Sequence, residues 1–304
     1  MGSILSWTLK LPHVAYHAPG SLEEGLELLA AGDGEARVLA GGQSLLPMMA
    51  LRLARPSLLI DLRRVGGLAG IQVDDAGMRI GALTTELVAE RHPAVRASSP
   101  LLLEALEFIG HPAIRSRGTV GGSLCHADPA AELPAVALVL EAVLTARSLR
   151  RGERAIAAQD FFLGPFTTAL EFDEVVTEVR LPAPPEPRGT CFLEVSRRPG
   201  DFAMVGVAAA VARDGARVSD LRLALTGVGD RPRPFTLDEL ELDAQAAPDT
   251  LFKVAGRSVG MRLRPPEDLH ASAAYRRHLA TVLTERALRT AFDRAPAQGG
   301  MAGA

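Results

Sequence analysis

The pattern of hydrophobic and polar positions predicts short strands that alternate with helices along the chain. Capping signals mark several helix starts: Ser21 with Glu24 forms a capping box, Ser99 precedes a proline, and Thr84 or Thr85 caps a short helix. The helix that follows Ser21 is predicted to run to about Leu29, and the helix that follows Ser99 to about Ile109. Two further helices are predicted at 45–53 and 272–291. The predicted strands are 37–40, 57–62, 71–73, 78–80, 138–146, 175–181, 191–197 and 221–226.

The segment Pro182–Pro187, with the sequence PAPPEP, interrupts this pattern. Proline cannot donate a hydrogen bond to a sheet, so this run predicts a stiff extended connector. We therefore place a domain boundary at 182–187. The final residues, PAQGGMAGA, are expected to be disordered.

Composition excludes several classes of protein. The 304 residues suffice for about two domains, and the 47% hydrophobic and 23% charged residues are typical of a soluble globular protein. The 4% aromatic content and the net charge of -3 argue against a nucleic-acid partner. Two cysteines cannot form a disulfide framework, and no targeting or transmembrane segment is evident, so we expect a cytoplasmic protein.

The segment RGTVGGSLCHADPAAE, Arg117–Glu132, concentrates the chain's candidate chemistry. It holds two adjacent glycines together with Thr119, Ser123, Cys125 and His126. Such a segment could be a nucleophile site, a metal site or a backbone loop that binds an anion.

The backbone interpretation fits the sequence better than the other two. The nucleophile motif G-x-S-x-G fails, because the last position is Cys125, and a small buried cysteine is the simpler explanation. A metal site would need further Cys or His ligands at suitable spacing, which are missing from the sequence around His126. Paired glycines, in contrast, let the main chain approach a ligand and direct N–H groups at an anion.

A second segment of the same kind strengthens the anion interpretation. Ala40-Gly41-Gly42-Gln43-Ser44 also follows a predicted strand, contains paired glycines and a hydroxyl, and leads into a helix. Two such loops could hold the two phosphates of a dinucleotide. Neither matches G-x-G-x-x-G, so a Rossmann fold is disfavoured, although both could still be plain strand–helix turns.

Four stretches in one order resemble a known family. They are AGGQSLLPMMALRL (40–53), IGALTT (80–85), IRSRGTVGGSLCHADPAAELPA (114–135) and EVSRRPGDFAMVGVAAA (194–210). Together they resemble the FAD-binding medium subunit of molybdenum-containing hydroxylases, the group of carbon monoxide dehydrogenase and xanthine dehydrogenase. Residues 268–288 are similar to that family's last helix, so the resemblance covers nearly the whole chain.

The resemblance implies an α+β fold in which two subdomains bind FAD in a PCMH-like, non-Rossmann arrangement, followed by a C-terminal α+β domain. The expected divisions are 1–61, 62–181, the connector 182–187, and 188–304. The implied FAD-binding residues are Ala40, Gly41, Gly42, Gln43, Ser44, Thr119, Val120, Gly121, Gly122, Ser123 and Glu132. Glu132 replaces the family's usual aspartate, Gln43 stands where histidine is common, and Cys125-His126 stand where Ala-Asn is common.

The resemblance also implies a function. The chain would be the FAD-carrying electron-transfer subunit of a heterotrimeric molybdenum hydroxylase, with a small [2Fe–2S] subunit and a large molybdopterin subunit as partners. No catalytic or metal-binding residue is expected in this chain itself. The segment SRRPGDF, 196–202, would lie near the flavin or a partner, or else be an exposed turn. The alternatives are a self-contained FAD-dependent oxidase or dehydrogenase and a non-enzymatic nucleotide-binding protein.

Overall fold

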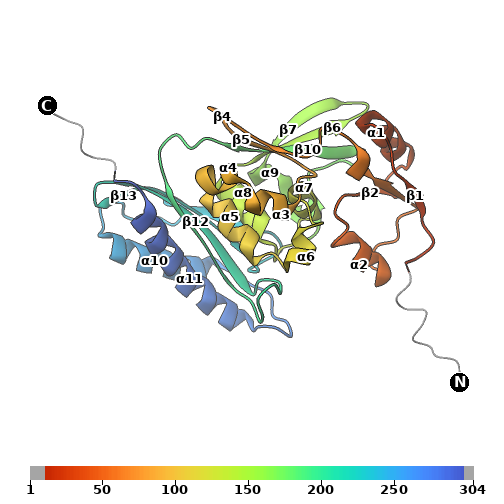
Figure 1. Ribbon diagram of the computed structural model, residues 1–304. Helices are drawn as coiled ribbons and strands as arrows, with labels where there is room; N and C mark the ends of the chain where they lie inside the picture. The colour runs from red at the N-terminus through yellow and green to blue at the C-terminus, as the bar shows by residue number, and fades with distance from the viewer. Residues whose placement is uncertain (1–10, 298–304) are drawn as a thin grey trace, which may run out of the picture.

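The computed structural model describes residues 11–297 and begins with a small parallel sheet. This N-terminal part contains β1 (Ala15–His17), α1 (Leu22–Ala31), β2 (Ala36–Leu39), α2 (Leu45–Ala50) and β3 (Leu58–Asp61), with strand order β1-β3-β2 (Figure 1). The predicted cap of α1 is confirmed, since the Ser21 side chain accepts a hydrogen bond from the Glu24 amide. Helix α2 is shorter than predicted, because Arg52 adopts φ 65 just after it and ends the helical path.

The middle part is a five-stranded antiparallel sheet with helices packed against it. Its strands follow the order β4-β5-β10-β6-β7, and β4 and β5 form the predicted hairpin, in which Ile71 pairs with Ile80. The strands are β4 (Ile71–Asp74), β5 (Gly77–Gly81), β6 (Val143–Ser148), β7 (Gly152–Ala157) and β10 (Glu174–Pro182), with a separate β8 (Phe162–Gly164) and β9 (Thr167–Thr168). The helices are α3 (Glu86–Arg91), α4 (Pro93–Ser98), α5 (Pro100–Phe108), α6 (Pro112–Arg115), α7 (Val120–His126), α8 (Glu132–Val139) and α9 (Ala158–Phe161).

Two predictions for this part need correction. The strand predicted at 138–146 is the end of α8 followed by a turn, with Glu141 at φ 52, and β6 starts only at Val143. Helix α8 is apolar and buried around most of its circumference, so its sequence does not show the helical period. Pro182 also belongs to β10, where it is paired with Gly77, so the extended connector begins after it.

The C-terminal part is a four-stranded antiparallel sheet that is covered on both faces. Its strands are β11 (Gly189–Val195), β12 (Val205–Asp214), β13 (Arg217–Thr226) and β14 (Arg233–Thr236), in that order. Helices α10 (Pro248–Arg262) and α11 (Ala273–Arg294) cover one face, and α5 and α8 of the middle part pack on the other (Figure 1). Across residues 11–297, every helix is too short or too polar to traverse a lipid bilayer.

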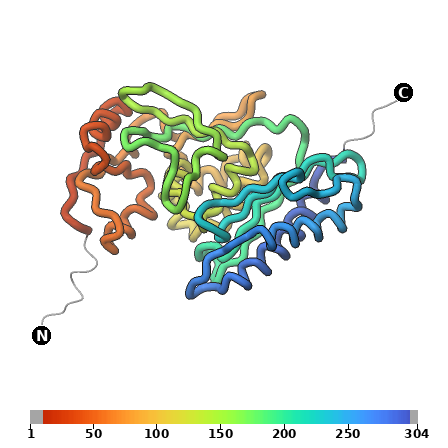
Figure 2. The backbone as a smooth tube through the Cα atoms, turned by 180° about the vertical axis from the view of Figure 1, so that it is seen from behind, coloured from red at the N-terminus to blue at the C-terminus, as the bar shows by residue number. Residues whose placement is uncertain are grey.

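The middle part therefore lies between the N-terminal part and the C-terminal part, which are on opposite sides of it (Figure 2). Glu104 of α5 accepts hydrogen bonds from the Phe192 amide (2.8 Å) and from Arg294 (2.6 Å). The carbonyl of Pro129 accepts from the Thr226 hydroxyl (2.6 Å) and from the Gly227 amide (2.8 Å). These contacts fix the stretch before α8, where the candidate site lies, against the C-terminal sheet.

Candidate functional site

The two glycine segments of the sequence touch each other. A Cβ added to Gly41 would lie 2.1 Å from the Arg117 carbonyl oxygen and 2.8 Å from the Gly118 Cα. A Cβ on Gly122 would lie 3.6 Å from that of Ala40. The contact at Gly41 is backbone against backbone, which only glycine permits. The structure thus brings together segments that are far apart in the sequence.

The first segment carries free backbone donors. Within residues 11–297, the amides of Gly42, Gln43 and Ser44 donate to no protein acceptor. Gly42 adopts φ 74, a left-handed conformation that glycine favours, and the Gln43 side-chain amide donates to the Gly41 carbonyl at 3.3 Å. Three successive unpaired amides in a turn form a concavity suited to an anion. The residues present here fit a pyrophosphate group.

The second segment differs from the predicted loop, because it is the first turn of a helix. Thr119 caps α7, and its side chain accepts a hydrogen bond from the Gly122 amide at 3.1 Å. The amides of Val120, Gly121 and Ser123 donate to Thr84, Ala82 and Thr119 carbonyls. The N–H groups of residues 120–123 therefore already have protein acceptors, and the assignment of Thr119–Ser123 to the FAD site stays a prediction.

Close packing explains the glycines of the second segment. A Cβ on Gly121 would come within 2.7 Å of the Ala82 carbonyl oxygen, so this glycine lets α7 pack on the end of β5. Val120 is 3% exposed and belongs to the core, which leaves its side chain unable to reach a ligand. Ser123 is partly exposed, and its hydroxyl makes no hydrogen bond within residues 11–297, so it is free to bind a ligand.

Glu132, the remaining predicted site residue, begins α8 and is buried. The pKa of its carboxyl is raised to about 7, chiefly by burial, with a backbone hydrogen bond opposing the shift and the charge of Asp128 adding to it. Sequence reasoning missed two other glutamates nearby, the buried Glu86 and the partly buried Glu194. Neither position carries a local signal of burial, because Glu86 directly follows the Thr85 cap and Glu194 alternates with Leu193 and Val195.

Cys125 and His126 lie on α7 next to this site without forming a reactive pair. Burial raises the pKa of the Cys125 thiol to about 12, so the thiolate is scarce at neutral pH. Burial lowers the pKa of His126, against the opposing effect of Asp128, and the imidazole packs on the Phe166 ring with centroids 5.0 Å apart. Within residues 11–297, no group of three His, Cys, Asp or Glu side chains is placed to hold a metal ion.

Cys125→Ala is expected to leave FAD affinity within about twofold of that of the unchanged chain, because a neutral, partly buried thiol packed against the core acts as a small apolar group. Fluorescence titration of each purified protein with FAD measures this. A loss of FAD binding in Cys125→Ala, with folding intact by circular dichroism, would contradict the packing role.

The segment SRRPGDF forms an exposed turn that lies on the stretch before α6. Gly200 adopts φ 85, and a Cβ there would come within 3.0 Å of Gly110 backbone atoms and 2.9 Å of the His111 ring. Phe202 is 68% exposed. The turn therefore contacts the chain that leads through α6 to Thr119.

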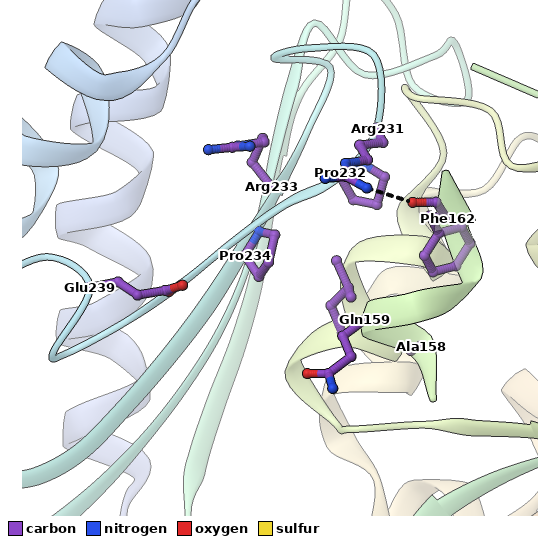
Figure 3. Close-up of a pocket in the computed structure, with 9 residues that line it drawn as sticks. Ala158, Gln159, Phe162, Arg231, Pro232, Arg233, Pro234 and Glu239 are labelled. Carbon is purple, nitrogen blue, oxygen red and sulfur yellow. Dashed lines mark hydrogen bonds between the residues drawn. The ribbon is translucent and has the colours of Figure 1, made fainter. Parts of the chain in front are cut away.

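A small cavity lies elsewhere, between the α9–β8 region and the connection from β13 to β14 (Figure 3). Its volume is about 230 Å³, and the Arg231 guanidinium donates to the Phe162 carbonyl beside it at 3.1 Å. None of the predicted site residues lines this cavity.

Comparisons with known proteins agree with the predicted family. Residues 12–184 match the FAD binding domain in molybdopterin dehydrogenase, and residues 190–291 match the CO dehydrogenase flavoprotein C-terminal domain. The 6-hydroxypseudooxynicotine dehydrogenase complex subunit alpha of Paenarthrobacter nicotinovorans is 39% identical, over 94% of this chain and 97% of its own. The nicotine 6-hydroxylase medium subunit of the same organism is 38% identical, over 92% of this chain and 98% of its own.

Solved structures match as well. Carbon monoxide dehydrogenase from Hydrogenophaga pseudoflava gives a TM-score of 0.89 at 37% identity, covering 94% of this chain and 100% of the matched one. Quinoline 2-oxidoreductase from Pseudomonas putida 86 gives 0.87 at 36% identity, covering 93% and 98%.

Proposed function

Because the chain belongs to the family of FAD-binding medium subunits of molybdenum-containing hydroxylases, we propose that it carries electrons through FAD from a partner's iron–sulfur clusters to an external acceptor. The predicted family, the α+β fold and FAD as the cofactor are confirmed. The chain is an FAD-binding oxidoreductase subunit of the kind found in multi-subunit enzymes such as carbon monoxide dehydrogenase. The electron route is the part that we propose.

The observation that carries the FAD site is the row of free amides at Gly42, Gln43 and Ser44, held against the second glycine segment. We place the pyrophosphate there, because successive backbone N–H groups bind phosphate oxygens without a lysine. The hydroxyls of Ser44 and Ser123 add donors on either side. Glu132 would face another part of the cofactor, whereas Val120 and Gly121 support the site from the core.

Bound FAD supplies the redox chemistry, and the chain supplies binding, orientation and electrostatics. The backbone of the first segment binds the phosphates, and the contact between Gly41 and Gly118 fixes the distance between the segments. No acid or base of this chain is required for electrons to pass through the cofactor. We therefore assign no catalytic residue.

The partners in this proposal are a small [2Fe–2S] subunit and a large molybdopterin subunit. A [2Fe–2S] cluster takes four thiolates, and the sequence has two cysteines, Cys125 and Cys191, so the clusters belong to another chain. Relatives with different substrates in their names are nearly equally similar to this chain: 39% for the 6-hydroxypseudooxynicotine enzyme and 37% for carbon monoxide dehydrogenase. This near-equality favours a substrate site outside the medium subunit.

The isolated chain is expected to bind FAD, to release FAD rather than FMN on denaturation, and to hydroxylate no organic substrate. Chromatography of the released flavin, together with an activity assay of the lone chain and of the co-expressed complex, checks this. Hydroxylation by the lone chain would favour a self-contained oxidase. Failure to bind FAD would favour a nucleotide-binding or assembly protein.

A further inference from the structure

Three glutamates from separate elements lie together behind the glycine segments, and we call them the glutamate cluster. Glu86 is the first residue of α3, Glu132 is the first residue of α8, and Glu194 lies in β11. Glu86 is 3% exposed and Glu132 is 6% exposed, while Glu194 is partly buried. The elements that carry them, α3, α8 and β11, all pack on α5, and the charge of Glu132 raises the pKa of both other carboxyls.

Glu86 connects this cluster to the candidate FAD site. Its amide donates to the Gly118 carbonyl at 2.9 Å, and its Oε2 would lie 2.5 Å from a Cβ on Gly118. Gly118 in turn is the residue on which Gly41 packs. Oε2 of Glu86 is buried and has no hydrogen-bond partner within residues 11–297, and the same holds for Oε2 of Glu194. An unpartnered carboxyl oxygen therefore lies directly behind the contact between the two segments.

Little positive charge compensates these carboxyls. Arg115 of α6 faces Glu86 and lowers its pKa, but its guanidinium is already paired with Glu90 at 2.6 Å. Asp128 adds a negative charge beside Glu132. Two buried carboxyls and a partly buried third, with a single cation that acts on Glu86, are not all ionised, so the cluster retains protons near neutral pH.

Burial is the main cause of this proton retention at each site. It raises the pKa of Glu86 to about 8, with the charge of Glu132 adding to the effect and Arg115 opposing it. It raises the pKa of Glu194 to about 8, again with a contribution from Glu132. Both groups therefore change protonation in the range where FAD binding is measured.

We propose that the glutamate cluster takes up a proton from solvent when FAD binds to the adjacent glycine segments, so that FAD affinity depends on pH. The inference rests on the FAD site proposed above. The pyrophosphate brings two negative charges and excludes water, and both effects favour the protonated form of a nearby carboxyl. One solvent proton joins one carboxylate oxygen, and no electron transfer is involved.

The sign follows from linkage. Since the FAD-bound form holds more protons, affinity is greatest below the pKa values of the free cluster and falls as pH rises through about 7 to 9. For one proton taken up, the dissociation constant increases by up to about tenfold per pH unit in this range.

Isothermal titration of the purified apo chain with FAD tests the coupling. The binding heat at about pH 8 is compared in HEPES and in Tris, which differ in their heat of ionisation, because a proton taken up by the protein is released by the buffer. We expect roughly 0.5 to 1 proton per FAD bound. FAD binding with the same heat in both buffers overturns this inference and leaves the proposed function standing, whereas no FAD binding at all contradicts the proposed function.

A double variant locates the proton. Glu86→Gln with Glu194→Gln keeps the shape of both side chains, and proton uptake is expected to fall by at least half while FAD still binds. Glu107→Gln is the matched control, since Glu107 is an exposed glutamate on α5, and it should keep the full uptake. Undiminished uptake in the double variant, or a loss equal to that of the control, would assign the proton elsewhere and overturn the proposal.

Discussion

Replacing Gly41 by alanine is expected to weaken FAD binding by roughly 100-fold or more, about 3 kcal/mol of binding free energy. The added methyl group would lie 2.1 Å from the Arg117 carbonyl oxygen and 2.8 Å from the Gly118 Cα. Both are main-chain atoms, so no side-chain rotation relieves the clash and the two segments must move apart. Amides aimed at a pyrophosphate lose their geometry when the segment that carries them moves.

Gly66→Ala is the matched control for this substitution. A Cβ at Gly66 meets nothing within 4 Å, and its φ is not positive, so the same chemical change carries no steric cost there. Fluorescence titration with FAD and thermal melting of the apo proteins separate binding from folding. Wild-type FAD affinity in Gly41→Ala would show that the contact between the segments does not support the site.

Much of the fold could be predicted where burial is one-sided. The hairpin β4–β5 alternates, and the Ser21 cap of α1 is a local signal, so both were predicted. Strand β12 was missed because both its faces are buried: Ala208 and Ala210 face the middle part, while Val207, Ala209 and Val211 face α10 and α11. A run of eight buried residues shows no alternation.

Helix α10 was missed for a different reason. Gly256 and Gly260 lower its helix propensity, but a Cβ at these positions would meet Thr281 of α11 at 2.5 and 2.2 Å. The glycines are needed for close helix packing, which local sequence does not reveal. The terminal residues expected to be disordered overlap positions 298–304, which lie outside the described residues.

For the candidate site, the sequence identified the two glycine segments but not their different roles. The amides at 42–44 are free, whereas those of Val120 and Gly121 are paired with the carbonyls of Thr84 and Ala82. These acceptors lie outside both motifs, so the motifs alone do not show the difference. The contact between Gly41 and Gly118 and the glutamate cluster likewise depend on how α3, α8 and β11 meet. The division into segments 1–61, 62–181 and 188–304 stays a prediction.

The other large effect is expected at Arg276, a buried arginine of α11 that is 4% exposed. Its guanidinium pairs with Asp268 at 2.6 Å and donates to the carbonyls of Met204 (2.5 Å) and Gly227 (3.0 Å). The amide of Gly227 donates to the Pro129 carbonyl, which lies just before α8 and Glu132. Arg276 thus holds the turn at Gly227, which in turn holds the stretch at Pro129 just before Glu132.

Arg276→Ala is expected to destabilise the protein by roughly 2 to 4 kcal/mol, because it leaves the carbonyls of two buried residues, Met204 and Gly227, without their donor, whereas the exposed Asp268 carboxylate regains water. The melting temperature should fall by about 10 °C, as measured by differential scanning calorimetry. Arg277→Ala is the control: the adjacent side chain makes no hydrogen bond or ion pair within residues 11–297, so its removal should cost less than about 0.5 kcal/mol. Equal melting temperatures for the two variants would mean that the hydrogen bonds and ion pair of Arg276 add nothing to stability, which would contradict this prediction.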